Sequence, residues 1–413
     1  MSFRDSFGAL RERQFRLLFT GQLVSLLGDA LTSVALAFAV LDVTGSARDL
    51  GYVAAAKAIP LVGFLLVGGV FSDRLPRRAV MLTADVVRMG SQGCVAALVL
   101  THSAQLWQLI VLQAVAGTAS AFFNPASTGL TPMTVSPEHL QQANALRGLS
   151  MAFTGVSGFA LSGVLTAAVG PGYALAIDAA SFGVSAIFLA QLRLPPHITL
   201  PKQSFLADLH EGWREFASRT WVWVIVVCAS IGNMASSMFI VLGAVLFKRE
   251  LGGAVPWALV LASISIGQIV GGFIALRVHF RRPMLASSPM LFGTSLMIAL
   301  LALHAPTAAI AAAALLSGIG NMVFNSLWET ALQQHVPATA LSRGSAYDWF
   351  GSLAFQPLGL VLAGVLAGAV GVDQTLWVAV ALSAGSIVAM LLPRSVRTLE
   401  SGGLHEAALE QVA

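Results

Sequence analysis

The chain has 413 residues, of which 56% are hydrophobic and only 10% are charged. A water-soluble fold cannot hide so large an apolar share, so the composition excludes an ordinary soluble protein and predicts an integral membrane protein. The formal net charge of +4 is small, and the basic residues gather in loops on alternate sides of the apolar runs, which indicates membrane topology rather than nucleic-acid binding.

Apolar runs follow one another along the whole chain. A membrane-crossing helix needs about 20 apolar residues, so the chain has room for about twelve such helices with short loops. In the first half, three runs lie at 15–41, 79–100 and 106–125. A further run between the first two ends at residue 72, and the last two runs begin at residues 140 and 172. In the second half, four runs lie at 221–247, 257–280, 342–369 and 375–392. The two runs between 280 and 342 end at residues 303 and 334. We therefore predict an all-α membrane protein with twelve transmembrane helices.

Polar segments set the expected topology and the domain boundaries. The N-terminal segment is basic, which predicts that it is cytoplasmic, with Arg4, Arg11, Arg13 and Arg16. The longest polar stretch contains LADLHEGWREF, an amphipathic sequence expected on the cytoplasmic membrane surface. We expect an N-terminal six-helix bundle over 1–193, a cytoplasmic linker over 194–219, a C-terminal six-helix bundle over 220–393 and a cytoplasmic tail over 394–413.

The two halves repeat in sequence. SGVLTAAVG begins at residue 162 and AGVLAGAVG begins 201 residues later, at 363. At the same spacing of 201 residues, Gly117 corresponds to Gly318, and Asn124 corresponds to Asn325. Parallel repeats of this kind predict two pseudo-symmetric bundles, with a substrate cavity between them near the middle of the membrane.

A short basic loop after the second apolar run carries a specific motif. GGVFSDRLPRR at 68–78 resembles the signature loop of the major facilitator superfamily, approximately G-x-x-x-D-R-x-x-R-[RK], between its second and third helices. The matching residues are Gly69, Asp73, Arg74, Arg77 and Arg78. The resemblance implies the twelve-helix transporter fold and a gating role for the loop, whereas an ordinary basic cytoplasmic loop is the alternative.

Two charged residues follow the loop on the third predicted helix. Asp85 and Arg88 are three positions apart, so they share one helix face. We expect them to complete the charge network around Asp73.

Further stretches resemble one branch of this superfamily, the drug:proton antiporters that include macrolide-efflux and enterobactin-export proteins. They are LLGDALTSVAL, DVTGSARDLG, TADVVR, IDAASFGVSAIFL and LQQHVPATALSRGSA. The resemblance implies export and a bacterial inner membrane. One departure leaves the direction of transport open: antiporters of this type carry a Gly-Pro pair in the fifth helix, and here Phe159 follows Gly158.

No spacing in the sequence supports an enzyme. There is no phosphate-binding loop and no nucleophile–base pairing, and Cys94 and Cys228 lie alone in apolar runs, so neither a metal site nor a disulfide is predicted. The expected energy source is the proton gradient, with no cofactor.

Ionisable side chains inside apolar spans are costly and are therefore functional candidates. The candidates for proton coupling are Asp29, Lys57, Asp178, Glu329 and Asp348. Asp29 is the foremost, and it could pair with Lys57 in one conformation and separate from it in another. A static ion pair is the alternative for Asp29 and Lys57. For Asp178 a helix cap or a contact between helices is favoured over a role in transport.

Other polar and aromatic residues are candidates for gating and for substrate binding. Arg147 and Arg343 could form ion pairs at a cytoplasmic gate or meet a substrate. The candidates for a substrate cavity are Asn124, Asn233, Ser237, Met238, Asn325, Trp328 and Trp349. Hydrogen bonding between helices is the alternative for the polar members.

The sequence therefore predicts a proton-coupled exporter of amphipathic or hydrophobic small molecules, such as a drug, a siderophore or a metabolite. The expected partners are the lipid bilayer, protons and a small-molecule substrate, with both termini cytoplasmic and the chain working as a monomer. The alternatives on the same fold are a nutrient importer or uniporter and a lipid or lysolipid translocator.

Overall fold

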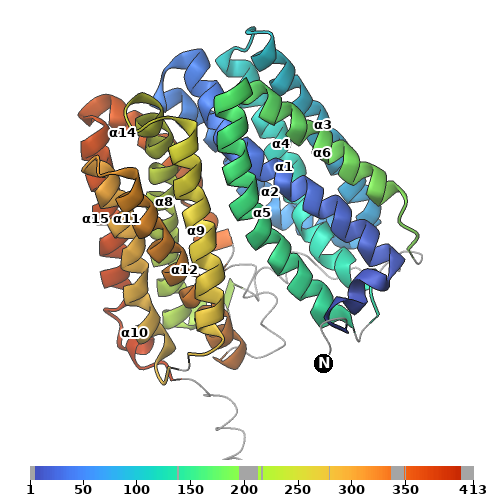
Figure 1. Cartoon of the computed structure of the whole chain (residues 1–413). Coiled ribbons are helices and arrows are strands. Elements are labelled where there is room, and N and C mark those ends of the chain that lie inside the picture. Colours follow the sequence, from blue (N-terminus) through green and yellow to red (C-terminus); the bar gives the residue numbers. More distant parts are fainter. Residues whose placement is uncertain are drawn as a thin grey trace, which may run out of the picture. The chain divides into compact units, whose positions relative to one another are not determined.

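The computed structural model describes residues 5–136, 139–194, 213–214, 217–278, 280–335, 348 and 350–400. All its regular elements in these ranges are helices (Figure 1). The chain divides into two compact units. The first contains Met1–Pro201 and Ala244–Ala262, and the second contains Lys202–Gly243 and Ser263–Ala413.

The first unit holds six long helices, preceded by the short 3-10 helix η1 (Asp5–Arg11). They are α1 (Arg13–Thr44), α2 (Ala47–Arg74), α3 (Arg77–Leu100), α4 (Leu106–Leu130), α5 (Leu140–Val169) and α6 (Pro171–Ala190), with η2 (Thr131–Met133) after α4. Helix α1 packs against α5 and α6, while α4 packs against α2 and α3, and α3 also contacts α6. This bundle positions the charged residues described below.

Helices α8 (Thr220–Arg249) and α9 (Ala254–Ala275) are divided between the units. The end of α8 and the start of α9 belong to the first unit, and the rest of each helix belongs to the second. The other helices of the second unit are α10 (Pro283–Ser287), η4 (Ser288–Leu291), α11 (Phe292–Ala302), α12 (Thr307–His335), α14 (Gln356–Val370), α15 (Val372–Met390) and α16 (Arg394–Arg397). In its core the indole rings of Trp221 and Trp328 meet edge to face, with centroids 5.5 Å apart.

Ten helical segments of the described chain are long and apolar enough to cross a membrane. Helices α2 and α3, with 28 and 24 residues, also exceed the length that a span needs, although each carries several charged residues. The expected all-α membrane architecture is confirmed. The ninth predicted span is interrupted: α10, η4 and α11 follow one another there, because Pro289 has no N–H to continue an α-helix.

The sequence repeat is also a structural repeat. The last glycine of each repeated segment, Gly170 or Gly371, joins two helices with nearly the same backbone angles, φ 91° and ψ 161° at one and φ 98° and ψ 161° at the other. A Cβ built on Gly117 would lie 2.1 Å from the carbonyl oxygen of Lys57, and one on Gly318 would lie 2.1 Å from that of Ile264. Each half thus uses the same glycine for close helix packing.

Candidate functional site

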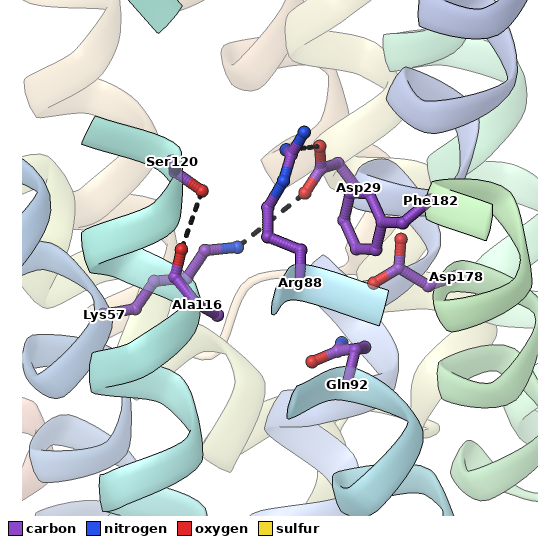
Figure 2. A pocket seen from close by; sticks show the side chains of 8 residues that line it. All are labelled: Asp29, Lys57, Arg88, Gln92, Ala116, Ser120, Asp178 and Phe182. Carbon is purple, nitrogen blue, oxygen red and sulfur yellow. Dashed lines mark hydrogen bonds and ion pairs between the residues drawn. The ribbon is translucent and has the colours of Figure 1, made fainter. Parts of the chain in front are cut away.

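The charged residues of the first bundle surround one small cavity (Figure 2). Its lining comes from α1, α2, α3, α4 and α6, and consists of Asp29, Lys57, Arg88, Gln92, Ala116, Ser120, Asp178 and Phe182. Its volume is about 10 Å³, close to the smallest space that holds one water molecule. A drug-sized ligand needs hundreds of cubic ångströms, so this cavity suits water and protons rather than an organic substrate.

Asp29 lies between two cations at the edge of this cavity. Its Oδ1 is 3.8 Å from Lys57 Nζ, and its Oδ2 is 3.8 Å from Arg88 Nη1. About a third of the Asp29 side chain (35%) is exposed. The structure therefore brings together the acid and the lysine that the sequence nominated, and it adds an arginine from α3.

Arg88 is the most enclosed cation of the cluster, with 5% of its side chain exposed. It forms an ion pair with Asp85, whose side chain is fully buried. Its guanidinium lies 4.1 Å from the ring centroid of Phe123 and 4.4 Å from that of Phe182. An arginine can stack on two rings and still bind carboxylates, because its planar group offers π faces and a fork of N–H donors.

Asp85 and Arg88 belong to this cluster. The network that the sequence predicts between them and Asp73 stays a prediction, because the side chain of Asp73 lies outside the described part of the structure. Arg88 lies eleven residues after Arg77 on α3, about 16 Å along the helix axis at 1.5 Å per residue. The two residues do share one face, as expected, but that face meets Asp29 and the aromatic rings of α4 and α6.

Asp178 is almost fully buried, with 1% exposure. Thr32 Oγ1 donates a hydrogen bond of 2.5 Å to its Oδ2, and Gln92 Nε2 donates in turn to Thr32 Oγ1 at 2.8 Å. Gln113 Nε2 extends the chain with a bond of 3.2 Å to Gln92 Oε1. Asp178 Oδ1 is buried and has no hydrogen-bond partner among the described residues.

Sequence reasoning missed Thr32, Gln92 and Gln113. A signal for Gln92 was present, because it follows Arg88 by four positions and so lies on the same face of α3. Thr32 and Gln113 carry no such mark, since single neutral polar residues are common in apolar helices.

Close packing holds α1 against α6 at this point. A Cβ on Gly28 would lie 2.2 Å from Ser181 Oγ and 2.5 Å from Asp178 Oδ1. Only glycine leaves room there for the aspartate. Nearby, α5 packs on the other side of α1, where a Cβ on Gly158 would lie 2.5 Å from that of Ala30.

The basic loop after α2 contributes helix caps. Arg77 Nη1 donates to the carbonyl oxygen of Gly129 at 2.6 Å, near the end of α4. Arg78 Nε donates to that of Leu189 at 2.9 Å, near the end of α6. Cations at helix C-termini are stabilising. Gly69, Asp73 and Arg74 lie within α2, but their side chains are outside the described part of the structure.

Comparison with protein families decides the identity. The family described as transmembrane secretion effector matches residues 4–408, nearly the whole chain. The chain belongs to this family of major facilitator transporters. The resemblance read from the loop motif is therefore confirmed, and a transporter rather than an enzyme is shown.

Curated relatives of this transporter include drug efflux proteins. The multidrug efflux pump Tap of Mycolicibacterium fortuitum is 28% identical over 399 residues, which cover 89% of this chain and 92% of Tap. Macrolide efflux protein A of Streptococcus pyogenes is 20% identical over 373 residues, which cover 87% of this chain and 91% of the relative. The transporter is thus distantly related to efflux pumps.

Solved structures share its fold. A bacterial homologue of the iron transporter ferroportin superposes with a TM-score of 0.73 at 19% identity, covering 92% of this chain and 98% of that one. A bacterial homologue of the lysosomal transporter Spinster gives a TM-score of 0.72 at 14% identity, covering 93% and 96%. At these identities the match shows the major facilitator fold alone.

The remaining titratable candidates of the transporter lie elsewhere. Asp348 accepts hydrogen bonds from Trp328 Nε1 at 3.0 Å and from Ser352 Oγ at 3.4 Å, while Glu329 is exposed. Arg147 donates to Thr131 Oγ1 at 2.9 Å and to Ser127 Oγ at 3.4 Å. Arg343 lies outside the described residues.

The residues nominated for a substrate cavity have varied surroundings. Asn233 Nδ2 donates to the carbonyl oxygen of Ser352 at 2.9 Å, and Ser237 Oγ donates to that of Asn233 at 2.9 Å. Met238 and Trp328 are buried, with 0% and 5% exposure.

Asn124 and Asn325, the repeat-related pair, are both exposed. Trp349 lies outside the described residues. Hydrogen bonding within and between helices accounts for Asn233 and Ser237, and a role in substrate binding stays a prediction for the whole set.

Proposed function

We propose that this transporter exports amphipathic or hydrophobic small molecules from the cytoplasm and is driven by the proton gradient. The observation that carries the proposal is the position of Asp29, held between Lys57 and Arg88 at the edge of a cavity with room for one water molecule. The relatives that are multidrug and macrolide efflux proteins support the direction of transport and the type of substrate.

The ion pairs of Asp29 supply a mechanism for coupling. Ionised Asp29 attracts Lys57 from α2 and Arg88 from α3, and so holds three helices together. A proton that reaches Asp29 through the cavity removes its charge and both attractions. The balance between two conformations of the transporter then shifts, because protonation favours the one in which these helices are not held by the ion pairs.

The organic substrate binds outside the small cavity in this proposal, because the cavity is too small for it. The nominated asparagines, tryptophans and Met238 stay the candidates for that second site. Alternating access between the two halves exposes it to each side of the membrane in turn. The proposal includes a bacterial inner membrane, a monomeric state and cytoplasmic termini. The arginines that crowd the N-terminal segment support the cytoplasmic side for that end of the chain.

Efflux of a fluorescent lipophilic cation, ethidium, from cells or everted vesicles tests the proposal. We expect the wild type to move ethidium only with an imposed proton gradient, and Asp29→Asn to lose this dependence. Asp49→Asn is the matched control, because it changes a carboxyl group to an amide in the first turn of α2, away from the cavity. Gradient-independent transport by the wild type, or normal coupling in Asp29→Asn, would show that the proposal is wrong.

A further inference from the structure

The charges around the cavity do not balance. Among the described residues the cluster contains three acids, Asp29, Asp85 and Asp178, but two bases, Lys57 and Arg88. If every group were ionised, one uncompensated negative charge would lie inside a bundle that crosses the membrane. Such a charge is expensive, whereas a single bound proton makes the cluster neutral.

Ion pairing indicates which two acids are ionised. Asp85 is paired with Arg88 although its side chain is fully buried. Asp29 has Lys57 and Arg88 each at 3.8 Å. Asp178 has no basic group within ion-pair distance among the described residues, and its partners are neutral. The acid without a cation is therefore the one to hold the proton.

The hydrogen-bond chain fixes where that proton would lie. Thr32 Oγ1 accepts a hydrogen bond from the amide of Gln92 and donates its own hydrogen to Asp178 Oδ2. Oδ2 is therefore an acceptor and has no need of a proton. Oδ1 is buried and has no hydrogen-bond partner among the described residues, so a proton there would not compete with any donor.

We propose that Asp178 holds one proton on Oδ1 while Asp29 is ionised, and that the two acids exchange this proton through the cavity that both of them line. In the exchange, the O–H bond at Asp178 breaks and an O–H bond forms at Asp29, with a water molecule in the cavity carrying the proton between them. The number of bound protons stays at one. Asp178 becomes the ionised acid, and Lys57 and Arg88 are released from Asp29.

The groups that face this exchange come from every helix around the cavity. Asp29 and Thr32 lie on α1, and Lys57 lies on α2. Helix α3 supplies Asp85, Arg88 and Gln92, and α4 supplies Gln113 behind Gln92. Figure 2 shows the carboxyl group of Asp178 entering the cavity from α6, with Gln92 and Arg88 beside it.

Infrared spectroscopy tests the location of the proton without any transport. The full chain is purified with ¹³C-labelled aspartate, and the carbonyl-stretch band of protonated carboxylic acid is recorded at neutral pH. We expect the wild type to show this band with the isotope shift of an aspartic acid. Asp178→Asn should lose the band. Asp178→Glu should keep a band without the isotope shift, because its acid is an unlabelled glutamate.

Two outcomes would overturn the proposal. One is the absence of a protonated-aspartate band in the wild type, which does not depend on the folding of any variant. The other is a band of undiminished intensity in folded Asp178→Asn, as judged by size-exclusion chromatography and circular dichroism, because the proton would then lie on an aspartic acid other than Asp178.

The coupling role of Asp178 rests on the proposed function, and ethidium transport tests it separately. We expect Asp178→Asn to lose at least tenfold of the gradient-driven accumulation of ethidium. Full accumulation by Asp178→Asn would overturn the exchange step. If the wild type shows the infrared band but no proton-dependent transport, the proposed function fails while the assignment of the proton to Asp178 stands.

Discussion

At the scale of single residues, Arg88 decides how charge is arranged in the first bundle. It pairs with the buried carboxylate of Asp85, approaches Asp29 and stacks on the rings of Phe123 and Phe182. A buried carboxylate that loses its cation has neither water nor a counter-charge to stabilise it. The Asp85–Arg88 pair therefore acts as one structural unit.

Removing only the arginine should lower the free energy of unfolding far more than removing both charges of the pair. We expect Arg88→Gln to lower the free energy of unfolding by about 3–5 kcal/mol, because Asp85 is left buried and unpaired. The double variant Asp85→Asn, Arg88→Gln should recover a large part of this loss. Thermal unfolding of the purified variants in detergent measures both, and a double variant that is no more stable than Arg88→Gln would contradict the idea.

At the scale of elements, a carboxylate holds the start of α1 against the segment between α4 and α5. Both carboxylate oxygens of Glu12, which precedes α1, lie 3.0 Å from the backbone nitrogen of Ser136, and Oε1 lies 2.7 Å from His139 Nδ1. Burial raises the pKa of Glu12, but the hydrogen bonds with His139 and Ser136 outweigh it and hold the pKa below the ordinary value of 4.5.

The pH dependence of this contact has a definite sign. Because the pKa of Glu12 is lower in the folded chain, its contribution to stability is present above the unfolded pKa and is lost as the pH falls through the folded one. We expect Glu12→Gln to lower the thermal midpoint at neutral pH, by an amount equivalent to about 1 kcal/mol given its partial exposure. The difference from wild type should shrink as the pH falls below 4.5 and should disappear below the lowered pKa of Glu12 in the folded chain. A difference that persists in acid would mean that the carboxylate charge is unimportant.

At the scale of the whole molecule, the two halves use the same packing at equivalent points. Gly117 and Gly318 are 201 residues apart, and each brings its helix against a backbone carbonyl group of a neighbouring helix. Gly158 and Gly359, also 201 residues apart, pack on Ala30 of α1 and on Met234 of α8. The position of Asp29, just before Ala30, corresponds by these contacts to that of Asn233, so the second half has a neutral amide where the first half has this acid.

Equivalent glycines should be equally sensitive to substitution. We expect Gly117→Ala and Gly318→Ala each to cost about 1–3 kcal/mol, because the added methyl group meets a backbone carbonyl that cannot rotate away. Gly63→Ala on α2 and Gly385→Ala on α15 are matched controls, since a Cβ at either position meets nothing within 4 Å. Thermal unfolding that shows a loss at only one of the two glycines would contradict the structural repeat.

The sequence by itself determined the membrane class, the order of the helices, the repeat and the transporter family. These follow from properties that are local in the chain: the length of an apolar run, the spacing of GVL…AVG and the residues of one loop. It also nominated Asp29, Lys57 and Asp178, because an ionisable residue in an apolar run is conspicuous wherever it points. It did not pair Arg88 with Asp29, since a one-dimensional pattern shows which helix face a residue occupies but not what that face contacts.

Only the tertiary structure decided that acids and bases from α1, α2, α3 and α6 share one cavity the size of a water molecule. The rotation and the separation of each helix depend on contacts between residues far apart in sequence, such as Gly28 against Ser181 and Thr32 against Asp178. Those contacts distinguish an acid held between two cations from one surrounded by neutral groups. The physical reason is that a charge is set by its surroundings in three dimensions, whereas the apolar pattern of a span is complete within its own helix.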